Sequence, residues 1–387
     1  MKRIFIASAP LIAAIALAAC NANSSTSMPQ TNGQPQVAKA TAACQGSRAG
    51  RAQCDVLVRS GVDPNFAGLT PANLWSAYKL ATLVPVHGAG QVVAVVDAYD
   101  NPNVTTDLAA YRSQFALGAP NFTKYNQLGQ MSNYPSGSSG WGVEIDLDVE
   151  MVSASCPKCT IILVEANSTG WSDLQTAEAE AVTKGATIIS NSFSGTGANQ
   201  AFFSTPNKTY LASSGDSGYG IADPADFDTV VSVGGTTLSP AGPPRHWAET
   251  VWSGSGAGCS TDTKPAWQAD PGCTYRTAND VSADANPSTG VAEYDTYGYG
   301  GWIVVGGTSV GSPFLAGIFG LKGNATSQHG GKTFWIPAHQ VHLYPVLSGN
   351  DGSCSGPHTY LCTAGTGQYG NYSGPGGWGS PKGMGAF

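Results

Sequence analysis

The chain has 387 residues, of which 41% are hydrophobic, so it can bury a core large enough for one big domain or two ordinary ones. Only 11% of the residues are charged and the net charge is −7, which excludes a broad basic surface for nucleic acid or anionic lipid. Fifty glycines and 24 prolines indicate many tight turns, without an internal repeat.

The first twenty residues are predicted to be a targeting segment. Lys2 and Arg3 precede an apolar run over residues 4–19 that is too short for a comfortable membrane span. The LAAC sequence ending at Cys20 resembles a bacterial lipobox, in which the cysteine is lipidated and becomes the new N-terminus. Ordinary cleavage after one of the alanines is the alternative. We expect an exported bacterial protein, extracellular or anchored in the cell envelope through Cys20, with residues 21–43 as a flexible tether.

A short cysteine-bounded segment, residues 44–67, is expected to precede a main domain over residues 68–387. In that domain, apolar runs alternate with helical patterns. The predicted elements, in chain order, are a helix from about 71, strand 91–97, helices 105–115 and 143–155, strand 160–166, helix 172–184, strands 186–193, 209–213, 229–233 and 302–305, and a helix over 309–321. The alternation predicts an α/β fold with a doubly wound, mostly parallel sheet and helices on both faces, with sites at the carboxyl ends of strands. Residues 239–300 and 324–387 are expected to be long loops.

Cysteine usage agrees with export. Setting Cys20 aside leaves eight cysteines in four local couples, and local pairing is the simplest of the 105 connectivities that eight cysteines allow. The CPKC sequence at residues 156–159 precedes a predicted strand, whereas a reactive CxxC precedes a helix, so a structural disulfide is favoured over a redox motif. The couples are Cys44 with Cys54, Cys156 with Cys159, Cys259 with Cys273, and Cys354 with Cys362.

The sequence GGTSVGSPFLAG, residues 306–317, places Ser309 between a predicted strand and a predicted helix. A serine at a helix N-terminus is most often only an N-cap. The small residues around it and Pro313 are also similar to the nucleophile region of subtilisin-like enzymes. A nucleophilic serine needs a base to take its proton.

No histidine has the context that a subtilisin-like base requires. One histidine lies in a VPVHGAG loop, and the others lie in the Pro-, Gly- and Trp-rich stretches. The six histidines are His87, His246, His329, His339, His342 and His358. A conventional histidine-dependent subtilase would require one of these loop histidines to approach Ser309.

Four acids on one predicted helix offer a replacement. In WGVEIDLDVEMVSA, residues 141–154, two pairs of acids have i, i+4 spacing, so each pair shares a face. At about 100° per residue, Glu144 and Asp148 fall on the apolar side and are expected to be buried, which raises carboxyl pKa values and lets two groups share a proton. Asp146 and Glu150 are expected to be solvated. Four acids on a helix are more commonly a charged surface, but burying two without a purpose is costly.

A glycine-flanked aspartate, Asp216, follows a predicted strand in the sequence ASSGDSGYG, residues 212–220. A pepsin-like carboxylate would need two such loops, and the sequence contains one. Alone, the stretch is more typical of a turn.

Together these stretches resemble the sedolisins, the serine-carboxyl peptidases with a subtilisin-like fold. The matching motifs are E-x-x-L-D, S-G-D-S-G and G-T-S-x-x-x-P, and the resemblance extends from about residue 68 to the C-terminus. It implies Ser309 as nucleophile, Glu144 as general base, Asp148 as the residue that orients this base, and Asp216 as oxyanion-hole donor. Residues 189–195 look like the strand along which such enzymes lay an extended substrate.

The resemblance implies an acid-acting endopeptidase with polypeptide substrates, acting as a monomer through an acyl-enzyme. The family's large pro-domain has no counterpart between residues 44 and 67. Its calcium loop carries aspartates where Pro345 and Ser373 stand by our alignment, so calcium is left open, with Asp351 as a substitute ligand. The rival function is an inactive surface-binding module on the same fold.

Overall fold

The computed structural model describes residues 40–44, 49–59, 68–325 and 330–387. These residues belong to one compact unit that runs from Ala38 to Phe387. The predicted targeting segment, Cys20 and most of the predicted tether lie outside the described residues. Within the described ranges, no helix is long and apolar enough to cross a membrane.

An eight-stranded sheet forms the centre of the fold, in the order β11-β10-β9-β7-β4-β6-β5, with β14 paired to β10. All its pairs are parallel except β10 with β11, so the predicted mostly parallel sheet is confirmed. The bounds are β4 Val92–Ala98, β5 Asn121–Asn126, β6 Thr160–Ala166, β7 Ile188–Asn191, β9 Thr209–Ser213, β10 Val230–Pro240, β11 Trp247–Val251 and β14 Val281–Asp284.

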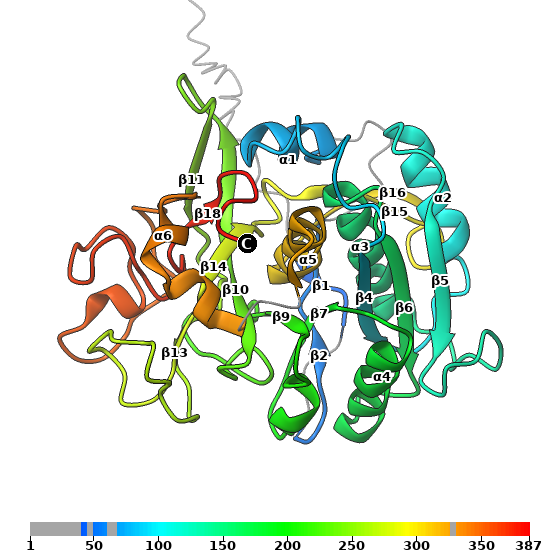
Figure 1. Ribbon diagram of the computed structural model, residues 1–387, viewed down its shortest axis with the longest axis horizontal. Coiled ribbons are helices and arrows are strands. Elements are labelled where there is room, and N and C mark those ends of the chain that lie inside the picture. The colour runs from blue at the N-terminus through cyan, green and yellow to red at the C-terminus, as the bar shows by residue number, and fades with distance from the viewer. Residues whose placement is uncertain (1–39, 45–48, 60–67, 326–329) are drawn as a thin grey trace, which may run out of the picture. The chain divides into compact units, whose positions relative to one another are not determined.

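Helices cover both faces of this sheet. Successive residues of β4 from Val93 to Ala98 point to opposite faces, and all are buried, so each face is covered. Helices α3 and α5 pack against each other and against β4, and α4 packs against β4 and β6, apart from them (Figure 1). The helices are α1 Pro71–Ala77, α2 Val104–Gln114, α3 Ser139–Ser155, α4 Trp171–Thr183, α5 Gly311–Lys322 and α6 Pro337–Gln340, with 3-10 turns η1 Gln200–Phe203, η2 Thr308–Val310, η4 Gly330–Trp335 and η5 Thr359–Leu361.

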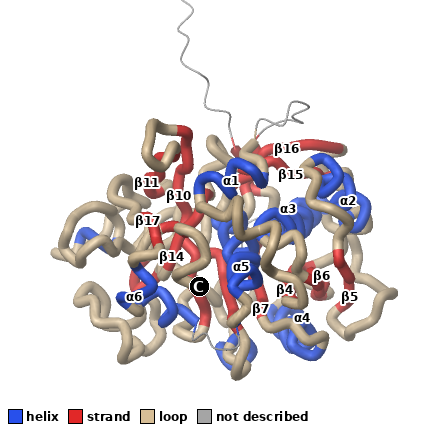
Figure 2. The backbone as a smooth tube through the Cα atoms, turned by 45° about the horizontal axis from the view of Figure 1, so that its top comes forward, coloured by secondary structure: helices blue, strands red, loops and turns tan. Residues whose placement is uncertain are grey.

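A second sheet, in the order β1-β3-β16-β15, lies beside the first and is antiparallel throughout. The strand predicted at 302–305 therefore joins this sheet and not the central one. Figure 2 shows β15 and β16 beside α2 and α3. The strands are β1 Ala40–Ala42, β3 Leu57–Arg59, β15 Val291–Asp295 and β16 Gly301–Gly306. Three further two-stranded pairs join β2 Gln53–Cys54 with β8 Phe193–Ser194, β12 Gly258–Cys259 with β13 Thr277–Ala278, and β17 Leu343–Tyr344 with β18 Ser380–Pro381.

The prediction of long loops over residues 239–300 is wrong, because β11 to β15 lie in this stretch. Each of these strands has two to five residues, and neighbouring glycines, prolines and aspartates interrupt the alternation by which a strand is recognised. Residues 324–387 carry less regular structure, namely α6, β17, β18 and two 3-10 turns among the residues described there.

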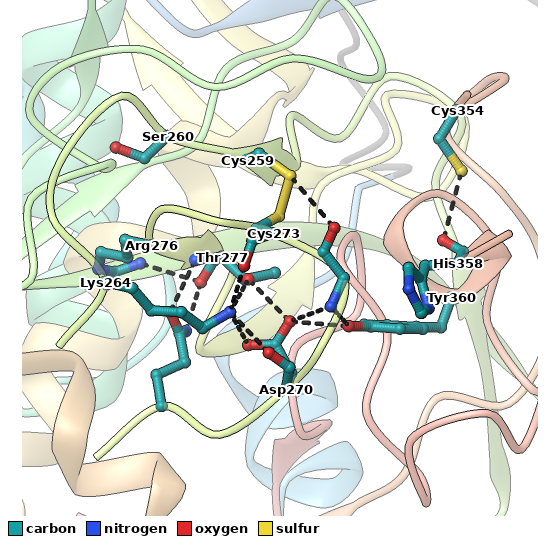
Figure 3. The surroundings of a disulfide bond; sticks show 12 residues. Cys259, Ser260, Lys264, Asp270, Cys273, Arg276, Thr277, Cys354, His358 and Tyr360 are labelled. Carbon is teal, nitrogen blue, oxygen red and sulfur yellow. Dashed lines mark hydrogen bonds and ion pairs between the residues drawn. A yellow bond between two sulfur atoms is a disulfide. The ribbon is translucent and has the colours of Figure 1, made fainter. Parts of the chain in front are cut away.

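All four predicted local disulfides are present. Around the bridge from Cys259 to Cys273, the buried carboxylate of Asp270 receives the Lys264 ammonium at 2.9 Å and the Tyr360 hydroxyl at 2.7 Å (Figure 3). The bridge and this ion pair together hold a region with little secondary structure.

Candidate active site

Ser309 follows β16, in the turn that leads into α5. Gly307 has a φ of 107°, a conformation that glycine adopts without strain, and a Cβ there would lie 2.2 Å from the Asp55 carbonyl oxygen. Both the backbone conformation and the close approach of the Asp55 carbonyl therefore require glycine at position 307. The Ser309 side chain is buried, and its hydroxyl donates to the Ser192 carbonyl oxygen at 3.4 Å.

Helix α3 buries all four of its acids. Ser138 is the N-cap, and every residue from Trp141 to Ser155 is buried. The prediction that Asp146 and Glu150 are solvated is wrong, because β15 and α2 cover the face that they occupy. A helical wheel compares the faces of one helix with each other and carries no information about a second layer of the fold.

Glu144 and Asp148 lie together on the face toward Ser309. Burial is the main cause that raises the Glu144 pKa well above its usual value, and the neighbouring charge of Asp148 raises it further. The Ser309 hydroxyl is close enough to lower that pKa in part, yet it is turned to Ser192, and no described residue hydrogen-bonds either Glu144 oxygen. Asp148 accepts the Ser192 hydroxyl at 2.6 Å, which fixes its carboxyl group. Two acids and the serine therefore adjoin, with the serine–glutamate hydrogen bond not formed in this state.

Asp216 lies on the other side of Ser309, after the end of β9. Its Oδ1 accepts the backbone N–H of Thr308 at 2.8 Å and the Thr308 hydroxyl at 3.0 Å. Its Oδ2 is buried without a hydrogen-bond partner among the described residues. Burial raises the Asp216 pKa well above its usual value, so the neutral form, which can donate a hydrogen bond from Oδ2, is favoured.

Two further buried acids stand behind the Glu144–Asp148 pair. Asp97 is the residue before the last of β4, and burial raises its pKa to about 8. Glu178 on α4 has a pKa well above its usual value, again because of burial. The charge of Asp97 raises the pKa of both Glu144 and Asp148. In the sequence, Asp97 ends the strand predicted over residues 91–97, and sites of such sheets gather at the carboxyl ends of strands.

The backbone of an N-terminal segment passes directly over Ser309. We call residues 49–59 the cleft segment (Figure 1, blue). Its strand β2 pairs antiparallel with β8, and its strand β3 pairs antiparallel with β16. Between these strands, Asp55 N–H donates to the Ser192 carbonyl at 3.3 Å, and the Asp55 carbonyl accepts the Ser309 N–H at 3.2 Å. Nothing in the sequence around Asp55 indicated this position.

The Asp55 side chain enters the protein beside β8 and β9. Its two oxygens accept the hydroxyls of Ser194 at 2.8 Å and Ser213 at 2.7 Å. Burial raises the Asp55 pKa to about 7, although both hydrogen bonds lower it. A cavity of about 300 Å³ continues beside the segment, and its lining includes Gln53, Ser194, Asp216 and Tyr219. The site is thus a groove that already holds an extended peptide.

No described histidine hydrogen-bonds the Ser309 hydroxyl, whose partner is the Ser192 carbonyl oxygen. His329 lies outside the described residues. The groups that shift the Glu144 pKa are Asp148, Asp97, Ser309 and Asp55, all of them carboxyl or hydroxyl side chains. In the described part of the chain, carboxylates therefore stand where a base for Ser309 is needed.

The residues considered for calcium offer one carboxylate, that of Asp351. Asp351 is buried, burial raises its pKa to about 7, and no described residue hydrogen-bonds its oxygens. Pro345 has no side-chain oxygen, and the Ser373 hydroxyl accepts the backbone N–H of Gly376. Calcium takes six to eight oxygen ligands, so the rest of such a shell would have to come from other oxygens than these side chains.

A different acidic cluster lies on the far side of α3. Asp107, Asp146 and Asp295 bring carboxylate oxygens within 4.8 Å of one another. Thr296 donates to Asp107, and Asn101 donates to Asp146. Oxygens at this spacing could hold a cation; burial favours the protonated acids instead, because it raises the pKa of each.

Comparison with known proteins agrees with this geometry. Kumamolisin from Bacillus sp. (strain MN-32) is 30% identical over 292 residues, which cover 64% of this chain and 51% of kumamolisin. Sedolisin from Pseudomonas sp. (strain 101) is 32% identical over 207 residues, 45% of this chain and 33% of sedolisin. In sequence, this chain is therefore similar to the sedolisins. No family model matches it.

The relationship to the sedolisins extends to three dimensions. The solved structure of Pseudomonas sedolisin, described as a serine-carboxyl proteinase in complex with pseudo-iodotyrostatin, superimposes with a TM-score of 0.69 at 26% identity. The match covers 82% of this chain and 96% of that one, and it confirms the predicted subtilisin-like α/β fold. The chain spans about half of kumamolisin and a third of sedolisin as full-length proteins.

Proposed function

We propose that this chain is a serine-carboxyl endopeptidase that hydrolyses polypeptides at acid pH through an acyl-enzyme on Ser309. The observation that carries the proposal is the placement of one peptide carbonyl, that of Asp55. It accepts the Ser309 N–H, and a Cβ added to Gly307 would meet this oxygen at 2.2 Å and Asp216 Oδ2 at 2.5 Å, so both oxygens adjoin the same glycine. A backbone amide and a protonated carboxyl beside a carbonyl oxygen form the donor pair that an oxyanion requires.

The proposed proton path uses only carboxyl groups. Glu144 accepts the proton of Ser309 as its hydroxyl oxygen attacks the substrate carbonyl, and then gives the proton to the leaving amine. Water attacks the resulting ester by the same path in reverse. Asp148, held by Ser192, orients Glu144 and shares a proton with it. Asp97 adjoins this pair, and wherever Asp97 is ionised its charge raises both pKa values.

The proposed cellular context follows from the sequence. We infer a signal peptide over residues 1–20, a tether over 21–43, a short N-terminal segment over 44–67 and the peptidase domain over 68–387. Export, an extracellular or cell-envelope location, a lipid on Cys20 and a monomeric state belong to the same proposal. The four disulfides support it, because such bridges persist in an oxidising compartment.

The activity is expected to fall steeply from about pH 4 to about pH 7. Burial raises the Asp216 pKa, so Asp216 stays protonated to higher pH than a free aspartate. As the pH rises through that raised pKa, the proton is lost, the oxyanion loses a donor and gains a repelling charge, and the rate falls. The measurement is hydrolysis of a denatured protein between pH 3 and pH 8. An optimum at neutral or alkaline pH would contradict the mechanism.

A further inference from the structure

We propose that five buried acids between α2, α3 and β15 form a clamp held by protons, which keeps the helix that carries Glu144 and the hairpin that leads to Ser309 together in acid and opens above neutral pH. We call these five residues the acid clamp. The proposal goes beyond the proposed catalysis and does not depend on it, because the clamp acts on the fold. The members are Asp107 on α2, Asp146 and Glu150 on α3, and Glu293 and Asp295 on β15.

The acid clamp lies where three elements pack against one another. Asp146 and Glu150 share one face of α3, and Glu293 and Asp295 point to the same side of β15, since side chains alternate along a strand. Oxygens of Asp107, Asp146 and Asp295 lie within 4.8 Å of one another. All five side chains are buried, so their carboxyl groups meet away from solvent.

Hydrogen bonds from neighbouring groups satisfy only part of these carboxyl groups. One oxygen of Asp146 accepts the Asn101 amide at 2.7 Å, and one oxygen of Glu150 accepts the Tyr294 N–H at 3.2 Å. The second oxygen of each of these acids and both oxygens of Glu293 have no hydrogen-bond partner among the described residues. An oxygen buried among carboxyl groups gains a donor when one of those groups carries a proton. Shared protons would therefore complete the cluster.

The cations around the acid clamp are engaged elsewhere. The three elements carry one cation between them, Arg112 of α2, which donates to a serine hydroxyl and to backbone carbonyl oxygens. Lys124 of β5 lowers the Asp146 pKa by its charge, but its ammonium pairs with Asp100 and Glu165. Neither cation forms an ion pair with a clamp acid.

The other titratable groups near the acid clamp add no positive charge. Tyr111 of α2 is buried, and its hydroxyl has no hydrogen-bond partner among the described residues. Burial is the main cause that raises the pKa of Tyr111 and Tyr299, and charges of the clamp raise both further, so both hydroxyls are neutral. Asp148, on another face of α3, adds only negative charge, which raises the Glu293 pKa. Neutralising the clamp is thus left to protons.

The acid clamp stabilises the fold in acid and loses this effect as the pH rises. Burial is the largest cause that raises the pKa of each clamp acid, so the folded chain keeps protons that the unfolded chain releases from about pH 4 upward. Each such acid multiplies the unfolding equilibrium constant by about ten per pH unit until the pH passes its folded-state pKa. The ionised acids also repel one another across the junction.

The acid clamp connects two parts of the candidate active site. Helix α3 presents Glu144 and Asp148 toward Ser309 and its clamp acids toward α2 and β15. Strand β15 pairs along its whole length with β16, the strand that leads to Ser309, and Figure 2 shows this hairpin beside α2 and α3. When the clamp ionises, α2 and the hairpin should separate from α3 while the central sheet stays folded, because the strand pairs of that sheet involve none of these acids.

The test follows hydrogen–deuterium exchange of the full chain by mass spectrometry between pH 4 and pH 9, in the presence of EDTA. Protection factors, corrected for the intrinsic exchange rate at each pH, are compared for α2, for β15 with β16, and for β6 in the central sheet. Glu293→Gln and Asp146→Asn keep the size of the acid and stay neutral at every pH. Glu178→Gln is the matched control, because Glu178 is also a buried acid without a hydrogen-bond partner among the described residues, but it lies on α4, which packs against β4 and β6.

We expect α2 and the β15–β16 hairpin of the wild type to lose protection by at least about tenfold between pH 5 and pH 8, at a lower pH than β6 does. In Glu293→Gln and in Asp146→Asn, the slope of the logarithm of this protection against pH should fall by about one, and the loss should move upward by about one pH unit. Glu178→Gln should lose protection in these segments at the same pH as the wild type.

Three results would overturn the inference. Protection of α2 and the hairpin that is constant with pH, or that falls only together with β6, shows that no clamp opens locally. A loss at the wild-type pH in both Glu293→Gln and Asp146→Asn, or an equal shift in Glu178→Gln, shows that these acids are not the cause. Protection at pH 8 that calcium chloride restores in the wild type and not in Asp146→Asn identifies a cation site instead.

These outcomes are separate from the test of the proposed function. Each of them leaves the proposed peptidase standing, because exchange reports the fold and not the reaction. Absence of hydrolysis at pH 4 by a chain whose α2 and β15–β16 hairpin are protected rejects the peptidase and leaves the acid clamp.

Discussion

Replacing Ser309 by alanine is expected to lower kcat/KM for peptide hydrolysis at pH 4 by a factor on the order of 10⁵ to 10⁶. The Ser309 hydroxyl is the group that the proposed mechanism joins by an ester to the carbonyl held by the Ser309 N–H. Alanine retains that N–H and Asp216, so the residual rate reports the oxyanion donors alone.

Ser312→Ala is a matched control for this variant. Ser312 is also a buried serine, on the first turn of α5, and its hydroxyl hydrogen-bonds that of Ser190 at 2.8 Å. It should keep kcat within about threefold of wild type, because it does not contact the Asp55 carbonyl. Equal turnover by Ser309→Ala and wild type would favour the rival function, a binding module that uses the sedolisin fold without catalysis.

Replacing Glu144 by glutamine is expected to lower kcat by about 10³- to 10⁴-fold at pH 4, with a small change in KM. Glutamine has the size of glutamate but cannot take the Ser309 proton. The substitution also removes a carboxyl group whose pKa is raised by burial and by the charge of Asp148. We therefore expect the variant to unfold at a temperature no lower than that of the wild type. The loss of rate would then reflect chemistry and not folding.

Asp146→Asn is the control for Glu144→Gln. Asp146 lies on the same helix and is equally buried, but it faces Asn101 on the side away from Ser309. If both variants lose rate to the same extent, the effect belongs to the helix. If Glu144→Gln keeps the wild-type rate, another group accepts the proton.

Much of the fold and of the site follows from local patterns. Long apolar runs such as residues 160–166 give β6, because a strand buried on both faces of a parallel sheet reads as a continuous hydrophobic stretch. Glu144, Asp148, Asp216 and Ser309 are predicted from their motifs. In the structure, Glu144 and Asp148 lie on the face of α3 toward Ser309, and Asp216 accepts hydrogen bonds from the neighbouring Thr308.

The remaining features depend on contacts between distant parts of the chain. Asp146 and Glu150 are buried because β15, about 150 residues later, covers them, and a single-helix pattern contains no sign of that layer. Asp55 reaches Ser309 because β2 and β3 pair with strands far along the sequence. Short antiparallel pairs of two or three residues leave too little alternation to be predicted.

The most direct test of carboxyl groups acting in place of histidine and amide is the pH dependence of kcat/KM for Asp216→Asn. Asparagine Oδ1 can accept the two hydrogen bonds from Thr308 that Asp216 accepts, and its amide is a donor at every pH. The account predicts that activity persists at acid pH and that the fall at high pH moves upward by at least about one pH unit. Asp216→Leu, without a donor, should lose about 10²- to 10³-fold at every pH. A fall at the same pH in Asp216→Asn and wild type would contradict the account, because Asp216 would then not be the acid whose proton limits the reaction.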